Sequence, residues 1–233
     1  VDGILNRRKT DYIDLYQLHW PERITNTFGK RDFDSSVNDK WEENFENVLF
    51  NLKTIISSGK VRQIGISNEN PWAFMKYLEL SKKKLPKTIT IQNPYSLLNR
   101  LFEIGNSEIC MREDVGLLAY SPLGFGVLSG KYLNGNMPKD SRLKLFPNLS
   151  RFSGENSMKA TSMYYNISKK YNLSLTQMAL SFVNSRPFVT SNIIGATKLN
   201  QLKENIESIN IDLSEDALKE INEVHKLIPN PAP

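Results

Sequence analysis

The sequence predicts an α/β protein built from parallel β/α units, organised as a single domain over residues 1–233. Short β-like runs alternate along the chain with longer amphipathic stretches, which is the pattern of a parallel sheet with crossover helices. Polar residues also cluster where the predicted strands end, and that rim carries the chemistry in α/β barrels. With 39% hydrophobic and 24% charged residues, the composition is that of an ordinary globular protein.

The elements follow one another in a regular order. The predicted strands span residues 12–19, 61–67, 88–92, 116–120 and 192–195. The predicted helices cover about 41–58, 71–84, 106–113, 158–171, 175–186, 199–208 and 215–227, with a polar loop over 22–39 and an irregular segment over 124–157. Apolar residues such as Phe45, Leu49 and Leu52 recur at helical spacing. Gly59 marks a left-handed helix end, and Asn70-Pro71 combines an N-cap with a proline at the first helical position.

Charge and composition argue against several classes of function. The net charge is +5, but the basic runs at 7–9 and 82–84 are short, fall where helices end and do not alternate with aromatic residues. The sequence therefore argues against a nucleic-acid partner. An anionic small molecule remains compatible with the positive net charge. No apolar run approaches a membrane span. The single cysteine, Cys110, excludes an internal disulfide and favours the cytoplasm. No metal-ligand spacing occurs, and His225 is predicted to be a surface residue.

Four motifs stand in order on consecutive predicted strands. They are DYIDLYQLHWP at 11–21, GKVRQIGISN at 59–68, GLLAYSPLG at 116–124, and IGAT at 194–197 followed by Gln201, Glu204 and Asn205. Together they resemble the aldo-keto reductase family, and the resemblance covers essentially the whole chain. Residues 91–100 and 229–233 are most similar to the bacterial Tas-type branch of that family.

The resemblance implies a (β/α)₈ TIM barrel that is incomplete here. The five predicted strands correspond to the fourth to eighth strands of the family's barrel, and the first three have no counterpart. A complete barrel of this type typically needs about 250 residues. Of the family's catalytic Asp, Tyr, Lys and His, only the histidine is present, as His19. The chain as given is therefore expected to be inactive in catalysis.

The implied activity is NADPH-dependent reduction of aldehyde or ketone carbonyls to alcohols, with a small-molecule carbonyl substrate. His19 would donate a hydrogen bond to the substrate oxygen and stabilise developing negative charge. Trp20 is predicted to border the substrate pocket, although packing at the rim of the barrel explains it equally well. Two alternatives remain open: an NADP(H)-binding regulatory subunit of the channel β-subunit type, and a catalytically inactive fragment.

The resemblance also assigns residues to NADP(H). The side chains of Ser67, Asn68 and Gln92 would hold the nicotinamide amide, or else serve as caps and loop hydrogen-bond partners. Tyr120 would stack on the nicotinamide, or lie in the core. The pyrophosphate would lie against the close-approaching backbone of Ser121, Pro122, Leu123, Gly124 and Gly126, with Lys131 and Arg142 as cationic partners. The adenosine and its 2′-phosphate would contact Gly195, Thr197, Gln201, Glu204 and Asn205. Thr197 would cap the predicted helix over 199–208, and an ordinary capped helix without a cofactor is the alternative.

Overall fold

The computed structural model describes residues 1–26 and 28–233; residue 27, inside the predicted polar loop, lies outside the described part. The chain divides into two compact units, which are taken separately below. The first comprises residues 1–26, 32–93 and 105–117, and the second comprises residues 27–31, 94–104 and 118–233. That the chain forms a single domain stays a prediction.

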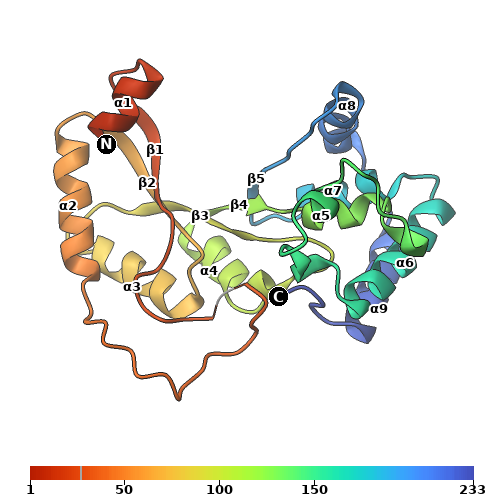
Figure 1. Ribbon diagram of the computed structural model, residues 1–233. Helices are drawn as coiled ribbons and strands as arrows, with labels where there is room; N and C mark the ends of the chain where they lie inside the picture. The colour runs from red at the N-terminus through yellow and green to blue at the C-terminus, as the bar shows by residue number, and fades with distance from the viewer. Residues whose placement is uncertain (27) are drawn as a thin grey trace. The chain divides into compact units, whose positions relative to one another are not determined.

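The first unit consists of parallel strands and their crossover helices (Figure 1). Its elements are α1 (Asp2–Arg8), β1 (Ile13–Leu18), α2 (Phe45–Ser57), β2 (Val61–Ser67), α3 (Pro71–Ser81), β3 (Thr88–Pro94), α4 (Asn106–Glu113) and the start of β4 (Gly116–Tyr120). The strands pair in parallel, with Leu18 opposite Ile66 and Ser67 opposite Gln92. Within this unit the strand order along the sheet is the chain order, β1, β2 and β3.

Gly65 in β2 is required by the close approach of its neighbours. A Cβ at this position would lie 2.3 Å from the Thr90 hydroxyl oxygen and 3.1 Å from the Gln17 side chain. The strand can therefore carry Gln17 and Thr90 on either side only because Gly65 has no side chain.

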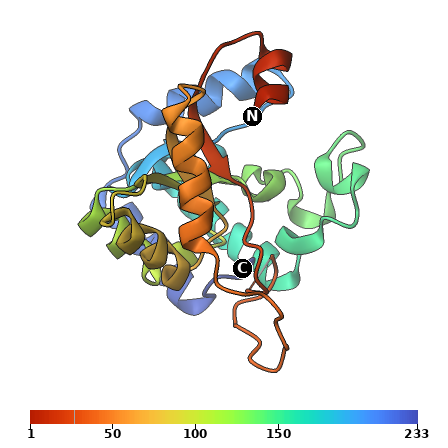
Figure 2. The ribbon, with the colours of Figure 1, turned by 90° about the vertical axis from the view of Figure 1, so that its left-hand side faces the viewer.

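Helices α2 and α3 cover one face of β1 and β2, and α2 crosses in front of them in Figure 2. The apolar stripe of α2 buries Phe45, Leu49 and Leu52. The predicted cap of α3 is present: the Asn70 side chain accepts a hydrogen bond from the Ala73 N–H, and Pro71 occupies the first helical position. The packing of α2 on β2 and on α3 therefore fixes the position of the strand ends and of the residues that follow them.

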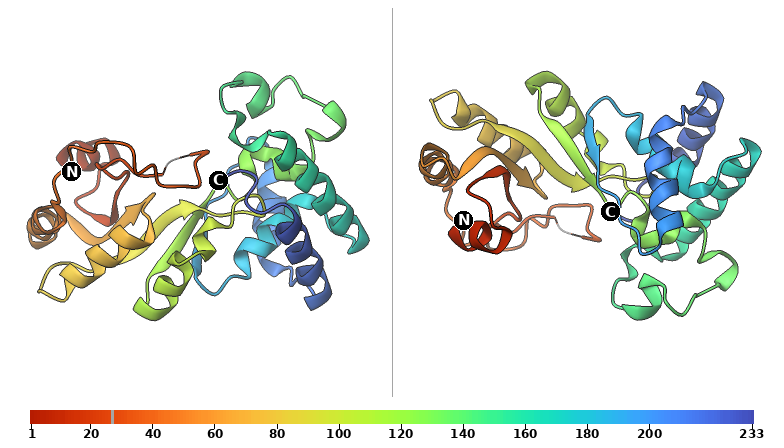
Figure 3. Two further views of the ribbon diagram at one scale, coloured as in Figure 1. Left: turned by 90° about the horizontal axis from the view of Figure 1, so that it is seen from below. Right: turned by 90° about the horizontal axis from the view of Figure 1, so that it is seen from above.

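The second unit is mainly helical. It contains η1 (Leu101–Glu103), the end of β4, η2 (Gly124–Ser129), η3 (Leu133–Gly135), α5 (Arg142–Leu145), η4 (Ser150–Phe152), α6 (Glu155–Lys170), α7 (Leu175–Asn184), β5 (Val189–Asn192), α8 (Leu199–Glu207), η5 (Ser208–Asn210) and α9 (Glu215–Leu227). Helices α6 and α9 pack together, as do α6 and α7 (Figure 3). Ser174 and Gln177 form a capping box at the start of α7.

The C-terminal residues after α9 are fixed to the rest of the second unit by hydrogen bonds of their main-chain and side-chain groups. The Asn230 Oδ1 accepts from the Arg100 N–H at 2.7 Å, and the Ala232 N–H donates to the Leu98 carbonyl at 3.1 Å. Arg31 donates to the carbonyls of Pro229 and Asn230 at 2.9 and 2.8 Å. The tail therefore holds two loops of this unit in place.

Several predicted boundaries differ from the structure. The α2 helix begins at Phe45 rather than at about residue 41, and α3 ends at Ser81, before the lysine run. The last strand is Val189–Asn192 rather than 192–195, so Gly195 does not end it. The Ile193 N–H still donates to the Ala119 carbonyl at 2.8 Å, but no further ladder bond follows. The sequence analysis also missed α1, a short amphipathic turn ended by Lys9 in the left-handed conformation.

Candidate functional site

In the first unit, the ends of three adjacent strands are joined by hydrogen bonds. The Asn68 side-chain amide donates to the His19 carbonyl at 2.9 Å and to the Ser67 hydroxyl at 3.1 Å. The Ser67 hydroxyl in turn donates to the Gln92 carbonyl at 2.7 Å. Four of the predicted site residues therefore lie together. Ser67 is 2% exposed and uses its hydroxyl internally, whereas His19 is exposed.

Asn68 can make these contacts because its backbone is left-handed, with φ of 61°. Asparagine tolerates this conformation better than most residues. Its N–H continues the β2–β3 ladder by donating to the Gln92 carbonyl at 3.1 Å. The side chain is thus turned toward the strand carrying His19, and the three strand ends are fixed as a group.

A small cavity of about 110 Å³ lies beside His19 in the same unit. Trp20 is one of the residues that line it, and its ring stands edge-on to His19 at a centroid distance of 6.4 Å. The other walls include the aromatic side chains of Trp41, Phe45 and Tyr77. The cavity is therefore lined by both aromatic and polar side chains, and one polar group among them is charged.

That polar group is a buried ion pair that the sequence analysis missed. Arg23 and Glu69 line the cavity and are only 8% and 5% exposed. The Arg23 guanidinium lies 5.2 Å from the centre of the Trp72 ring and 5.9 Å from that of Phe45. Arg23 lies in the polar loop, where no spacing or motif signals a partner 46 residues away. No sequence signal could have identified it.

In the second unit, the loop after β4 adopts an unusual backbone conformation. Ser121, Gly124, Phe125 and Gly126 have φ values of 56°, 52°, 55° and 87°. The Gly124 N–H donates to the Ser121 carbonyl at 2.9 Å, which closes the turn. Left-handed backbone is costly for residues with a Cβ. Glycine occupies two of these four positions, Gly124 and Gly126, and has no such cost.

The two predicted cations lie against this loop. A Cβ at Gly126 would stand 2.8 Å from the Lys131 ammonium nitrogen, so Lys131 lies directly over the glycine backbone. The Arg142 guanidinium lies 4.2 Å from the centre of the Phe125 ring. Lys131 therefore lies beside Gly126, and Arg142 lies beside Phe125.

Tyr120 precedes this loop. Burial raises the pKa of Tyr120 to about 12, and the charge of Arg151 opposes this shift. The Phe28 ring stands edge-on to the Tyr120 ring at 6.4 Å. Tyr120 is partly exposed, so the predicted stacking role does not conflict with its burial.

The residues predicted to contact adenosine are only partly available. Glu204 accepts a hydrogen bond from the Ser174 hydroxyl at 2.5 Å, which ties it to the start of α7. Asn205 is 4% exposed and donates to the Gly195 carbonyl at 3.3 Å. Thr197 is exposed but does not cap α8, whose N-cap is Lys198 without a side-chain bond. Its N–H and hydroxyl both donate to the Gln201 side chain, at 3.1 and 3.2 Å.

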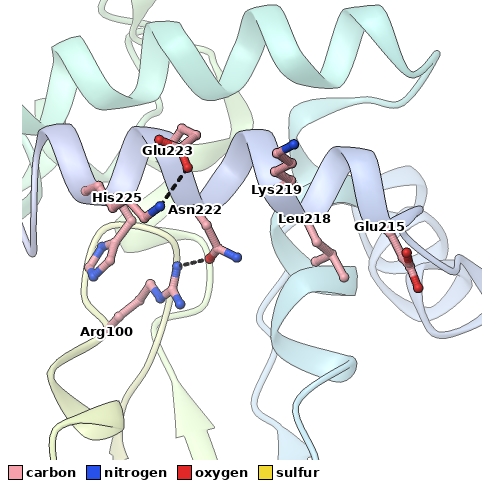
Figure 4. Close-up of a pocket in the computed structure, with 8 residues that line it drawn as sticks. Arg100, Glu215, Leu218, Lys219, Asn222, Glu223 and His225 are labelled. Carbon is pink, nitrogen blue, oxygen red and sulfur yellow. Dashed lines mark hydrogen bonds and ion pairs between the residues drawn. The ribbon is translucent and has the colours of Figure 1, made fainter.

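A second hollow lies on α9 and contains none of the predicted site residues (Figure 4). Arg100 points toward α9 and donates to the Asn222 side chain at 2.8 Å. His225, expected at the surface, is instead half-buried, and its Nδ1 is buried without a hydrogen-bond partner. Burial lowers the pKa of His225, and the nearby Arg100 adds to the effect. Arg100 reaches α9 beside His225, so this end of the helix is less exposed than the sequence indicated.

Other sources of reactivity have little support. Among the described residues, no group of three or more His, Cys, Asp or Glu side chains could hold a metal ion. Cys110 is buried on α4, and burial raises its thiol pKa to about 12, which disfavours the thiolate. Within the same described ranges, no helix has the length and apolar character needed to cross a membrane.

The Aldo/keto reductase family model matches residues 1–226. The protein Tas of Escherichia coli (strain K12) is 50% identical over 230 residues, which cover 98% of this chain and 66% of Tas. An aldo-keto reductase of Babesia bovis is 39% identical over 97% of this chain and 84% of its own length. The L-glyceraldehyde 3-phosphate reductase of Escherichia coli (strain K12) is 30% identical over 90% of this chain and 57% of its own length.

The chain belongs to the aldo-keto reductase family. It spans about two thirds of the length of Tas. The predicted family and the α/β class are confirmed, and the parallel strands with their helices are consistent with part of a (β/α)₈ barrel.

Proposed function

We propose that the protein is an NADP(H)-dependent oxidoreductase that reduces aldehyde or ketone carbonyls to alcohols. The observation that carries the proposal is the conformation of the loop after β4. Its backbone is left-handed, the Lys131 ammonium lies close to Gly126, and the Arg142 guanidinium lies over the Phe125 ring. A backbone that closely approaches its surroundings, with two cations beside it, suits a pyrophosphate. When bound, the nicotinamide group supplies the hydride.

The strand ends of the first unit would hold the carboxamide of the nicotinamide. A carboxamide presents both donors and acceptors, and the side-chain amide of Gln92 offers both, while the Asn68 amide is engaged with His19 and Ser67 and fixes the strand ends. The Ser67 hydroxyl already donates to the Gln92 carbonyl, so Ser67 positions Gln92 rather than donating to the cofactor. This assignment gives the three residues distinct roles.

His19 would act on the substrate. Its exposed imidazole follows β1, and its backbone is fixed through Asn68. From that position it would donate a hydrogen bond to the carbonyl oxygen and stabilise the negative charge that develops there. The aromatic cavity beside it, with Trp20 on its rim, would accept an apolar part of the substrate.

The 2′-phosphate of NADP(H) would contact the segment before α8. Thr197 is exposed, and its N–H and hydroxyl are satisfied by the Gln201 side chain. Rotation of that single side chain would release both donors to a phosphate. Glu204 and Asn205 would hold this segment in place. Glu204 accepts a hydrogen bond from Ser174 at the start of α7, and Asn205 donates one to the Gly195 carbonyl.

Fluorescence titration with NADPH and NADH tests the cofactor assignment. The intact protein should bind NADPH more tightly, and Arg142→Ala should narrow the preference. The matched control is Arg112→Ala, because Arg112 makes only an exposed ion pair with Glu108 on α4. Equal affinity for the two cofactors in the unaltered protein would contradict the assignment. NADPH binding without reduction of any aldehyde would instead favour an NADP(H)-binding regulatory subunit.

A cytoplasmic location completes the proposal. The support is that Cys110 is the single cysteine of the sequence, which fits a reducing compartment. Cell fractionation with an antibody to the protein would test it.

A further inference from the structure

The cavity beside His19 is small for a ligand pocket. Its volume is about 110 Å³, whereas pockets for drug-sized ligands typically have about 300–1,000 Å³. A water molecule occupies about 30 Å³ in the liquid, so the cavity has room for roughly three or four groups of that size. An apolar cavity that takes up benzene has about 150 Å³. The volume therefore fits a short aliphatic chain better than an aromatic ring.

The walls of the cavity are held in place by contacts among their own side chains. The Phe45 ring stands edge-on to Tyr77 at 4.8 Å and to Trp41 at 5.4 Å between ring centres. Phe45 is 2% exposed, and Ile66, which lines the cavity from β2, is 1% exposed. Protein interiors are close-packed, and forcing additional methylene groups into them costs stability. The volume of the cavity therefore limits the size of the group that enters it.

The charges around the cavity disfavour an anionic group. The Arg23 guanidinium is already paired with the Glu69 carboxylate, to which it donates at 3.1 and 2.6 Å. Glu22 adds a second carboxylate, which accepts a hydrogen bond from the Asn44 side-chain amide at 2.6 Å. Among the described residues that line the cavity, one guanidinium is thus present against two carboxylates. Since like charges repel, a carboxylate or phosphate of a ligand would be disfavoured here.

His19 places the cavity next to the carbonyl group of the substrate. It lines the cavity together with Trp20, and the proposed function assigns to its imidazole the hydrogen bond to the carbonyl oxygen. A carbonyl compound held by His19 would therefore have its alkyl chain beside the cavity. Burial of each methylene group is favourable, so chain length would affect binding until the cavity is full.

We infer that this cavity selects the alkyl chain of the substrate, so that the preferred substrates are uncharged aliphatic aldehydes with roughly three or four carbons beside the carbonyl group. This inference rests on the proposed function and specifies its substrate class.

A series of straight-chain aldehydes from propanal to octanal tests the inference in the intact protein. The value of kcat/KM should rise about fourfold for each added methylene group, reach its maximum at butanal or pentanal, and fall for longer chains. Benzaldehyde should be reduced less efficiently than pentanal. A profile that is flat, or that still rises at octanal, would overturn the inference while the proposed function stands.

Replacement of Val48 changes the volume of the cavity in both directions. Val48 lies on α2, lines the cavity and is half-buried. Val48→Ile should move the maximum to a shorter chain, and Val48→Ala should move it to a longer one. A general loss of structure would lower all rates without opposite shifts of the maximum. An unmoved maximum in both variants would overturn the inference.

Val61→Ala is the matched control for loss of packing. Val61 is 2% exposed, begins β2 at the end remote from Ser67, and is not among the described residues that line the cavity. Its replacement should lower stability and leave the maximum where it is. If Val61→Ala moves the maximum as Val48→Ala does, the shift does not report on the cavity and the inference fails.

Pentanal and 4-oxobutanoate test the preference for an uncharged chain. The second compound carries a carboxylate near the end of a chain of similar length. In the unaltered protein, kcat/KM should favour pentanal about tenfold or more, because the carboxylate meets an excess of negative charge. Equal or better reduction of 4-oxobutanoate would overturn the inference.

Binding of unreactive amides gives a readout that does not need turnover. Pentanamide should bind more tightly than acetamide or benzamide, measured with and without NADP⁺ by tryptophan fluorescence, since Trp20 and Trp41 line the cavity. Equal binding of the three amides overturns the inference. If no aldehyde is reduced, the proposed function fails, and this titration still decides whether the cavity takes a short chain.

Discussion

Arg23 and Glu69 form a two-point ion pair that is almost completely buried. The Arg23 Nη1 donates to the Glu69 Oε1 at 3.1 Å, and Nη2 donates to Oε2 at 2.6 Å. Burial raises the pKa of Glu69, although the hydrogen bonds and charge of Arg23 oppose that shift. The pair joins the residues after β1 to those after β2, next to His19, so its integrity determines the shape of the aromatic cavity.

Glu69→Gln should therefore be strongly destabilising. Removing one partner leaves the Arg23 charge buried and uncompensated, which typically costs about 3–5 kcal/mol. Urea unfolding of the chain would measure the change in free energy of unfolding. Asp14→Asn is the matched control, since the Arg62–Asp14 pair is exposed and such pairs contribute at most about 1 kcal/mol. An equal loss of unfolding free energy in the two variants would show that the buried ion pair stabilises the fold no more than the exposed one.

A double replacement separates the charge from the packing. Arg23→Met combined with Glu69→Leu should recover most of the lost stability, because apolar side chains of similar volume often replace a buried ion pair without loss. A double variant as unstable as Glu69→Gln would contradict this explanation.

Glu103 should make stability depend on pH. Burial acts to raise its pKa, but hydrogen bonds from Arg100 and Tyr95 outweigh this effect, and the net pKa is lowered from 4.5. A carboxyl with a depressed pKa in the folded state contributes stability above its unfolded pKa and loses it as pH falls through the folded value. The free energy of unfolding should therefore decrease as the pH falls below about 4.5.

Glu103→Gln should flatten this acid limb of the stability curve, measured by urea unfolding at a series of pH values. At neutral pH it should cost about 2 kcal/mol, because it weakens charge-assisted hydrogen bonds. Glu108→Gln is the comparison, since Glu108 makes only an exposed pair with Arg112. An acid limb of unchanged slope in Glu103→Gln would assign the acid sensitivity to other carboxyl groups.

Local signals account for the elements that the sequence predicted well. The bounds of β2 and β4 agree with the prediction because each is a short run of β-favouring residues between clear turn signals. The Asn70-Pro71 start of α3 depends on side chains only a few residues apart. The strand-end group of His19, Asn68 and Gln92 was predictable because parallel strands bring their carboxyl ends to one edge.

Long-range partners account for what the sequence did not predict. Arg23 and Glu69 are 46 residues apart, and Arg151 meets the Phe28 ring through tertiary packing alone. No periodicity encodes such contacts. Thr197 was a reasonable cap by residue type, but α8 begins one residue later and Gln201 takes the Thr197 donors.

Gly124→Ala should impair cofactor binding. Gly124 has a φ of 52°, and a Cβ there would lie 3.0 Å from the Phe152 ring. The left-handed conformation costs roughly 1–2 kcal/mol for a residue with a Cβ, and the contact would also displace the loop from Phe152. Fluorescence titration should show NADPH affinity reduced several-fold or more.

Gly135→Ala controls for backbone strain alone. Gly135 has a φ of 73°, and a Cβ there would meet nothing within 4 Å. It should destabilise the fold by a similar conformational amount and leave NADPH affinity unchanged. If both replacements weaken NADPH binding equally, the loop after β4 has no specific part in the cofactor site.

His19→Ala should lower turnover while leaving NADPH affinity within about twofold, because the proposed role of His19 is on the substrate oxygen. Loss of one donor to a developing oxyanion typically costs about 10²–10³ in kcat. His19 is exposed and its backbone is fixed by the Asn68 amide at 2.9 Å, so the fold should survive the replacement. Steady-state kinetics of aldehyde reduction in the intact protein would measure the effect, with deuterated NADPH to establish that hydride transfer limits the rate. His225→Ala removes the other histidine, on α9, and should not reproduce the loss. Unchanged turnover in His19→Ala under rate-limiting hydride transfer would remove His19 from the mechanism and leave the carbonyl oxygen to another donor.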